Sequence, residues 1–573
     1  MIKLSLKRVF IICNLIIFCS SAMSQSLVEP LLLKDINPNG SSRISELTVV
    51  GSHVFFFAAD SANNSKLWKS DGSPEGTVLV KEINPGPMGD WSASLQSNST
   101  SMISLRDTAY FFAFREDIGY ELWKSAGHDS NTVLVKDINP GPESANPTGN
   151  LSPKYNPFIF QGYYYFVAYR PDLGYELWRS DGSEAGTIPI TNIPGNSASI
   201  FPKQPEVIGD RIFFCINSNS AIPQLGFYAT DGTPGTEIQF SNLYPSGVIP
   251  MNGRFFTEWG EWIYFPAGTE SSSSELYRVS QDLNTVELFY DFNQDGDGSP
   301  REFFYVNDGF MFRARNTINE GPSNLAFRCD GTLSGLQILN DENGEPIAAE
   351  GTALQREKWL GWNNQVLFAD DDQVIWCGNG QQNGSIRLGL YGPIEGIENT
   401  GITKTSAVFG NQIVFQMDDT LNNELIILTD GTPENTFSLL DPEMWTLWEQ
   451  MILKGDTLFV VLEDESNNGV GMELYTFRLS DLPTSIHQLE SLNPLEKHIY
   501  PNPSLGKVIL SGAKVNSLAE IRNFQGQIVE SVMIDANASI EINPSNPAGV
   551  YFITWRDTYT NLEKHAKLAL LSN

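Results

Sequence analysis

One stretch of the chain has the residue types and spacing of a calcium-binding loop. Asp291, Asn293, Asp295, Gly296 and Glu302 fall at positions 1, 3, 5, 6 and 12 of the loop that holds Ca²⁺ between two helices, and Asp297 is a further ligand candidate. The flanking sequence is β-like instead of helical, and the same place in the repeat described below holds an ordinary turn. The segment therefore predicts either a calcium site or an acidic turn.

Signatures of catalysis are scarce. The chain has five histidines, and none lies between 129 and 486. There is no HExxH, no GxSxG and no phosphate-binding glycine loop. We predict no catalytic residues and no cofactor other than calcium. Paired carboxylates remain the one route to catalysis, because a glycosidase needs two acids and the chain has 68 Asp and Glu.

The charge of the chain excludes two classes of partner. With 36 Lys and Arg against 68 Asp and Glu, the formal net charge is -32. A field of that sign repels phosphate backbones and anionic lipids. We therefore expect no binding to nucleic acid or to a membrane surface.

The N-terminus predicts export. Basic residues precede an apolar run over 9–19, and small residues follow at Ala22 and Ser24, which is the pattern of a signal peptide spanning 1–24. A lipoprotein signal ending at Cys19 is the alternative, although bulky Phe18 precedes that cysteine. No later segment has the length of a membrane span. We expect Sec-type export to the periplasm and no transmembrane segment in the mature chain.

The cysteines left after signal removal do not form a redox or metal motif. Cys215, Cys329 and Cys377 are odd in number and widely spaced. We predict that all three are buried as small apolar side chains.

Between the two ends lies one repeated unit. A strand-like ELW element recurs with spacings of 48 to 55 residues, and an apolar run ending in Phe precedes each copy. The anchor positions are Trp68, Trp123, Trp178, Tyr228, Tyr277, Phe327, Trp376, Ile427 and Tyr475. The preceding Phe positions are Phe57, Phe112, Phe166, Phe214, Phe265, Phe312, Phe368, Phe415 and Phe459. In the eighth unit, Ile426 is an alternative anchor to Ile427.

This period predicts an all-β fold, a large β-propeller over 31–480. Units of about 50 residues with four short strands are typical of propeller blades. Leu31 to Asn37 reads as the last strand of a unit whose other strands are missing, and the ninth unit lacks its last strand. We expect this N-terminal strand to complete the final blade and close a ring of nine. A ring of eight blades with one displaced unit is the alternative.

The anchor positions admit a structural and a functional interpretation. Exposed Trp and Tyr faces bind sugar rings, but a residue that recurs in every blade and is replaced by an aliphatic one is a packing position. We predict that Trp123 is buried between sheets.

The repeat phrases resemble a known family. The segment from Glu121 to Gly141 and that from Glu176 to Gly195 repeat the pattern of the unit around Trp68, Asp71 and Gly72. These phrases resemble the ELWxSDGT repeat of secreted bacterial proteins, which implies a β-propeller. The resemblance implies no activity.

The last part of the chain, 498–573, differs in character and follows a linker at 481–497. Short β-like runs predict a small β-sandwich of about seven strands. The YPNP at 500–503, the turn at 523–527, the GVYFI at 549–553 and the basic run near the end resemble the type A C-terminal sorting domain of the type IX secretion system of Bacteroidota. That resemblance implies export through the outer membrane, with the secretion machinery as partner, and a secreted or cell-surface location.

Two functions fit these observations. The favoured one is a secreted or cell-surface propeller that binds a glycan or protein ligand or serves as a scaffold. The alternative is an extracellular polysaccharide hydrolase with carboxylates at the mouth of the propeller channel.

Overall fold

The computed structural model divides the chain into two compact units, Met1–Leu482 and Pro483–Asn573, and each is described by itself. The residues that the structure describes are 30–62, 64–85, 102–145, 157–193, 203–216, 226–241, 256–270, 273–293, 296–315, 324–341, 344–347, 359–369, 375–381, 384–388, 402–418, 424–432, 435–440, 445–464, 471–481, 499–500, 507–510, 518–522, 528–534, 539–541, 549–556 and 563–570. The predicted signal peptide and most of the predicted linker lie outside these residues.

The first unit consists of nine antiparallel sheets of four strands each. In eight of the nine, the strands are paired in the order in which they follow along the chain, so each repeat folds as a meander. Blades 1 to 4 contain β2 (Ser45–Val50), β3 (His53–Ala59), β4 (Ser65–Ser70), β5 (Val78–Lys81); β6 (Ile103–Leu105), β7 (Thr108–Arg115), β8 (Gly119–Ser125), β9 (Val133–Lys136); β10 (Phe158–Phe160), β11 (Tyr163–Arg170), β12 (Gly174–Ser180), β13 (Ile188–Pro189); and β14 (Lys203–Ile208), β15 (Arg211–Ile216), β16 (Gly226–Thr230), β17 (Ile238–Ser241).

Blades 5 to 8 repeat this arrangement, and the ninth departs from it in one strand. Blades 5 to 8 contain β18 (Thr257–Trp259), β19 (Trp262–Glu270), β20 (Ser273–Ser280), β21 (Val286–Tyr290); β22 (Arg301–Val306), β23 (Gly309–Arg315), β24 (Asn324–Cys329), β25 (Gln337–Ile338); β26 (Leu360–Trp362), β27 (Gln365–Ala369), β28 (Ile375–Gly378), β29 (Ser385–Leu388); and β30 (Ile402–Phe409), β31 (Gln412–Asp418), β32 (Glu424–Thr429), β33 (Phe437–Ser438). Blade 9 contains β34 (Trp445–Lys454), β35 (Thr457–Asp464), β36 (Glu473–Arg478) and, from the start of the chain, β1 (Leu31–Lys34).

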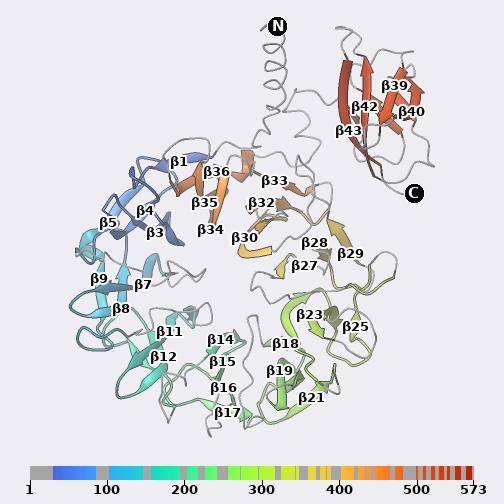
Figure 1. The fold of residues 1–573 in the computed structure, drawn as a ribbon. Helices are drawn as coiled ribbons and strands as arrows, with labels where there is room; N and C mark the ends of the chain where they lie inside the picture. The colour runs from blue at the N-terminus through green and yellow to red at the C-terminus, as the bar shows by residue number, and fades with distance from the viewer. Residues whose placement is uncertain are drawn as a thin grey trace, which may run out of the picture. The chain divides into compact units, whose positions relative to one another are not determined.

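The nine sheets stand around a ring, as Figure 1 shows, so the fold is the predicted propeller with nine blades. Within a blade such as blade 4, the first strand lies toward the middle of the ring and the fourth toward its outer wall. Helix is confined in the described residues to short 3-10 turns such as Asp129–Asn131 and Leu479–Asp481. No helix in the described part of the chain has the length and apolar character to span a bilayer.

The predicted closure by the N-terminal strand is confirmed. β1 pairs antiparallel with β36, with Leu31 opposite Thr476 and Leu32 opposite Tyr475. The fourth strand of the last blade therefore comes from the start of the chain, and an edge of β36 that would otherwise be unpaired is covered.

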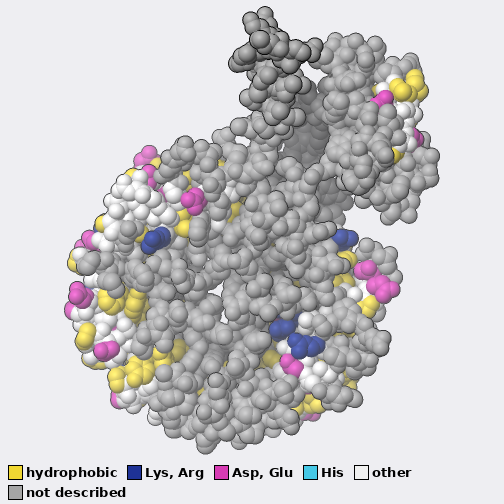
Figure 2. Space-filling model, in the orientation of Figure 1, with side chains coloured by type: hydrophobic (Ala, Val, Ile, Leu, Met, Phe, Trp, Pro, Cys, Tyr) yellow, Lys and Arg dark blue, Asp and Glu magenta, His cyan; other side chains and the backbone are white. Residues whose placement is uncertain are grey.

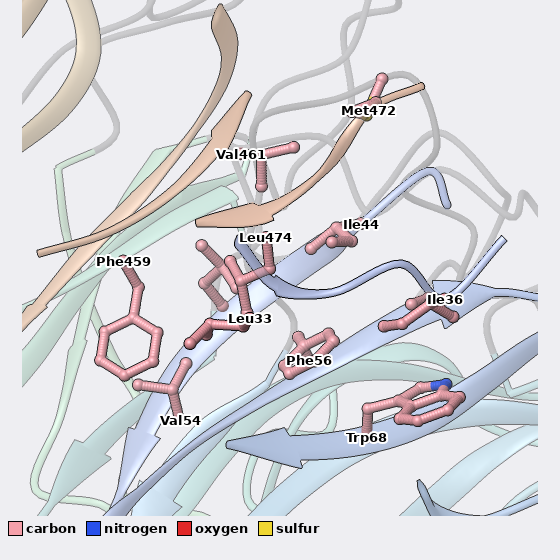
Figure 3. Packing of buried hydrophobic residues seen from close by; sticks show 12 residues of the cluster. Leu33, Ile36, Ile44, Val54, Phe56, Trp68, Phe459, Val461, Met472 and Leu474 are labelled. Carbon is pink, nitrogen blue, oxygen red and sulfur yellow. The ribbon is translucent and has the colours of Figure 1, made fainter. Parts of the chain in front are cut away.

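The junction between the last and the first blade is a packed apolar core. Figure 3 shows side chains from β1 and its following loop between the sheets of blades 9 and 1, with Leu33 and Phe459 close to Val54. Leu33 is 1% exposed and Leu474 is fully buried. The Lys454 Nζ of blade 9 also donates a hydrogen bond of 3.0 Å to the Asp71 carbonyl of blade 1. The junction that closes the ring thus has both a core and a polar contact.

The anchor positions are packing positions, as predicted. Eight of the nine are buried, from Trp178 at 0% exposure to Trp68 at 9%, and Tyr277 is partly buried. Trp123 is 3% exposed. In the eighth unit Ile427 pairs with Phe415, which identifies Ile427 as the anchor.

The Phe that ends the apolar run before each anchor pairs with the anchor in six of the nine blades. In blades 3 to 8 this Phe lies directly opposite the anchor, as Phe166 does opposite Trp178. In blades 1, 2 and 9 the residue opposite the anchor is instead Phe56, Phe111 and Val460, one position away from that Phe. The runs are apolar on both faces, because each sheet packs against a neighbour on either side, so alternation could not set the register.

The described residues of the second unit form seven strands in two sheets. The first sheet holds β37 (Ile499–Tyr500), β38 (Lys507–Leu510) and β41 (Ser539–Glu541), and the second holds β40 (Ile528–Met533), β39 (Leu518–Arg522), β42 (Gly549–Arg556) and β43 (Glu563–Leu570). The β-sandwich packing of these two sheets remains a prediction.

Two leucines of β1 test the closure with a matched pair. Leu33 is 1% exposed and Leu31 is 52% exposed on the same strand. We expect Leu33→Ala to lower the free energy of unfolding by about 2–5 kcal/mol, because it leaves a cavity in the closing junction. Leu31→Ala should change it by less than about 0.5 kcal/mol. Denaturant titration measures both, and equal effects would contradict the closure by β1.

Candidate functional site

The meander order sorts the connections onto two faces of the ring. In an antiparallel meander, successive connections alternate between the two ends of the strands. One face, here called the turn face, carries the links from first to second and from third to fourth strand. The other, the connection face, carries the links from second to third strand and from one blade to the next. The longer links are of this last kind, such as 82–102 and 137–157.

On the turn face, the repeated Asp-Gly builds a fixed turn between the third and fourth strands. Asp71 Oδ1 accepts hydrogen bonds from the backbone N–H and the hydroxyl of Ser73, at 2.8 and 2.7 Å. The hydroxyls of Ser70 and Thr77 lie 2.8 Å apart across the base of the turn. Gly72 has φ 105°, a conformation that favours glycine. The aspartate of the repeat is therefore a turn residue.

In several blades the same turn accepts a hydrogen bond from a basic side chain of the preceding blade. The Lys124 Nζ donates to the Gly182 carbonyl at 2.7 Å, and an Arg179 guanidinium nitrogen donates to the Gly232 carbonyl at 2.7 Å. Across the closing junction, Lys454 on the first strand of blade 9 donates to the carbonyl of Asp71 in the corresponding turn of blade 1. These basic residues are thus used in holding blades together.

On the connection face, the repeated glutamate of the ELW element is buried under the link to the next blade. Glu121 is fully buried and accepts the backbone N–H of Ile138 at 2.6 Å and that of Ala145 at 2.9 Å. One carboxylate therefore holds both ends of the segment 138–145. The carbonyl of Ala145 in turn accepts the N–H of Tyr169 in blade 3, at 2.7 Å.

Glutamates of three other blades occupy the same position. Glu176 accepts the N–H of Ile193 at 2.8 Å. Glu275 accepts those of Phe292 and Gly298, both at 2.7 Å. Glu473 accepts those of Ile36 and Asn37 at 3.2 and 3.3 Å, together with the hydroxyl of Ser42. We refer to these four residues as the buried glutamates: Glu121, Glu176, Glu275 and Glu473.

Burial dominates the ionisation of the buried glutamates. It raises the pKa of Glu121 to about 8 and those of Glu176, Glu275 and Glu473 to about 7. The hydrogen bonds that each carboxylate accepts favour its charged form and act in the opposite direction. These pKa shifts arise at structural carboxylates, so here they do not mark a catalytic acid.

The calcium candidates are divided among other partners. Asp291 Oδ1 accepts the N–H of Asn293 at 3.1 Å, and Asp297 Oδ1 accepts that of Ser299 at 3.0 Å. Glu302 lies 3.2 Å from the Arg313 guanidinium in a buried ion pair. Asp295 lies outside the described residues.

The loop that carries these candidates is the ordinary link of blade 5 to blade 6. Its Phe292 donates to Glu275 as Ile138 does to Glu121. Glu302 Oε2 accepts the N–H of Trp359 in blade 7 at 3.0 Å, as Glu206 accepts that of Phe256 at 3.2 Å between blades 4 and 5. No group of three or more His, Cys, Asp or Glu is placed to share a metal ion in the described ranges. Calcium binding stays a prediction.

Cys215, Cys329 and Cys377 are buried, as expected. Burial raises the pKa of the Cys329 thiol to about 11 and that of Cys377 to about 12, so both are protonated at neutral pH. A buried thiol in this state is a poor nucleophile and metal ligand.

Two groups of polar residues escaped the sequence interpretation. The buried glutamates recur two residues before the anchor in four units, and this periodicity was the available signal. The second group, Arg301, Arg313 and Arg315 in blade 6, has no counterpart in the other repeats and gave no signal.

The comparisons with known proteins agree with the two-part division of the chain. Residues 498–567 match the model of the secretion system C-terminal sorting domain. No curated protein matches the chain. The sorting domain implies that the chain is exported through the type IX secretion system to the cell surface or beyond.

Several solved structures share weak likeness with the chain. One is PorZ, described as an essential bacterial surface component of the type IX secretion system of Porphyromonas gingivalis, with 10% identity, 92% of this chain and 81% of that chain covered, and a TM-score of 0.33. Another is BamB from Moraxella catarrhalis, with 10% identity, coverage of 56% and 82%, and a TM-score of 0.31. A third is a puromycin-hydrolyzing peptidase from Mycobacterium tuberculosis, with 11% identity, coverage of 73% and 56%, and a TM-score of 0.37. These values are too low to say anything of activity.

The buried glutamates predict that the propeller loses stability as the pH rises. Their folded pKa values lie above the unfolded value of about 4.5, so the folded state binds more protons and is favoured at low pH. This contribution is complete below pH 4.5 and is lost as the pH rises through about 7 to 8. The aspartates of the turns, such as Asp71, have lowered pKa values and titrate below this window. We expect the melting temperature to fall between pH 5.5 and 8.5 (roughly the window of these groups).

A glutamine variant identifies the source of that dependence. Glu121→Gln cannot ionise, so its pH dependence should be smaller than that of the wild type by roughly 1–3 kcal/mol across the window. The same change at Glu116, an exposed residue of blade 2, is the control and should leave the dependence unaltered. A Glu121→Gln profile parallel to that of the wild type would refute the assignment.

Proposed function

We propose that the chain is a binding or scaffold propeller delivered by its C-terminal domain through the type IX secretion system, either released or displayed at the cell surface. The observation that carries this proposal is the use of the repeated polar residues. The aspartates cap turns, the glutamates hold links between blades, and the anchors fill the core. The repeat thus builds a rigid ring, and the residues that differ between blades are left to make contacts.

The connection face is the surface we assign to the ligand. It receives the long links between blades, and their sequences differ while their ends are fixed by buried carboxylates. Recognition loops on a rigid scaffold are a common arrangement for binding proteins, because the scaffold lowers the entropy lost on binding. The proposed ligand is an extracellular glycan or protein.

The repeat phrases further support an origin among secreted proteins of the ELWxSDGT type in Bacteroidota. The polysaccharide hydrolase remains the alternative, and it requires two carboxylates facing each other at the mouth of the ring. A glycan array with the full chain, followed by product analysis for each glycan bound, distinguishes the two. Binding without cleavage supports the proposal, and cleavage of a bound polysaccharide would replace it by the hydrolase.

Removal of the sorting domain tests the delivery route. We expect a chain lacking Tyr500 to Asn573 to fold its propeller and remain in the periplasm, because the two units form separate compact bodies. Protease treatment of intact cells, with the full chain as control, measures surface exposure. Protease-accessible truncated chain on intact cells would contradict the role of the domain.

A further inference from the structure

Blade 6 gathers three arginines on one face of its sheet. Arg301 on β22 lies directly opposite Arg313 on β23, and Arg315 follows two residues later on the same strand. Cross-strand partners and residues two apart share a face of a sheet. Met311, also on that face, packs against Trp359 and other residues of blade 7. The three guanidinium groups therefore belong to the junction of blades 6 and 7, at its connection face.

Positive charge at this place contrasts with the rest of the chain. Figure 2 shows Lys and Arg side chains on the inner side of the ring, in the sector where Figure 1 labels β18 and β23. The formal net charge of the chain is -32. A concentration of guanidinium groups in such a chain is a local reversal of its field.

The nearby carboxylates form an ion pair with only one of these three arginines in the described part of the chain. Glu302 pairs with Arg313 and accepts the Trp359 N–H with its other oxygen. Asp297 Oδ1 accepts the N–H groups of Ser274 and Ser299. Within the described ranges neither Arg301 nor Arg315 has a carboxylate at ion-pair distance. Two of the three guanidinium groups are thus available to an external anion.

Of the buried polar atoms at this junction that have no hydrogen-bond partner among the described residues, two bear on ligand binding. One is the donor Nε of Arg301, and the other is the acceptor Oδ1 of Asn324, whose residue is 4% exposed and lies directly opposite Arg315. A buried polar atom without a partner destabilises the fold, and native structures satisfy nearly all such atoms. A donor and an acceptor left open on one face call for a molecule that offers both an anionic oxygen and a hydroxyl.

We propose that the junction of blades 6 and 7 is a binding site for a small hydroxylated carboxylate, a hydroxy acid or sugar acid. Arg301 and Arg315 bind the carboxylate, Arg313 is positioned beside them by Glu302, and the Asn324 side-chain oxygen accepts a ligand hydroxyl. A planar carboxylate suits the fork of guanidinium donors. The site lies immediately beside the segment whose sequence predicted a calcium site. The positive charge of its arginines favours an anion instead of a cation.

The inference deepens the proposed binding function and rests on it. A free acid and the acidic end of a sugar chain offer the same chemistry. The net charge of the chain opposes long polyanions, so the free acid is the expected form.

Calorimetry with the full chain tests the site, using D-glucuronate as probe. Acetate supplies the carboxylate without hydroxyls, and glucose supplies the hydroxyls without charge. We expect glucuronate to bind about tenfold or more tightly than acetate, and glucose not to bind, because the charged contacts and the hydroxyl contact add. An oligogalacturonate tests the polymer source and should bind more weakly than the monomer. Equal heats for glucuronate and glucose would overturn the proposal.

Variants assign the contacts. Arg301→Gln should weaken glucuronate binding about tenfold or more, and Asn324→Ala should lower glucuronate affinity toward that of acetate while leaving acetate unchanged. Arg387→Gln, an exposed arginine of β29, removes the same charge elsewhere and should have no effect. Should Arg301→Gln melt well below the wild type, the partly exposed Arg315→Gln replaces it. Unchanged glucuronate affinity in a folded arginine variant would refute the site, whereas loss of it with array binding retained would leave the proposed function standing.

Discussion

The ring depends on one requirement, which is that the last blade must join the first as firmly as any other neighbouring pair. Glu473 meets it with a buried carboxylate that accepts the N–H groups of Ile36 and Asn37, directly after β1. The Ser42 carbonyl then accepts the N–H of Ala59 in blade 1 at 2.6 Å. The same sequence of contacts joins blade 2 to blade 3 through Glu121. Closure is therefore the ordinary blade junction, built from the two ends of the chain.

A buried carboxylate is an expensive choice for a residue that recurs in four blades. Its desolvation is offset by two backbone donors at Glu121, Glu275 and Glu473, and by one backbone donor and the Thr191 hydroxyl at Glu176. These donors would themselves be buried without partners if the glutamate were absent. The arrangement fixes where each link leaves one blade and where it reaches the next. In blade 1 the equivalent position is Lys66, which pairs with Asp60 and Glu82 at 2.9 and 3.2 Å. Different chemistry thus serves the same link, and the ring tolerates the exchange.

The architecture could be predicted from the sequence because its unit repeats along the chain. Anchors such as Trp178, the Asp-Gly turns and the missing last strand of the ninth unit all reported on packing that recurs, so nine copies reinforced one signal. The strand register within the apolar runs was harder to predict from the sequence. Phe56 and Phe57 are both fully buried, because both faces of β3 contact a neighbouring blade. The arginine cluster of blade 6 could not be predicted from the sequence for the opposite reason. They occur once, and their proximity arises from cross-strand pairing between Arg301 and Arg313, which no local pattern encodes.

The pairing of β1 with β36 also sets an order of events in time. β1 cannot reach its partner β36 until residue 478 has been made, so for most of the synthesis of the propeller its sheets form an open arc. The residues that match the sorting domain, 498–567, are made after these. The chain therefore presents its export address only when its ring is able to close. A chain that ends before β36 would lack both the closed ring and the sorting domain.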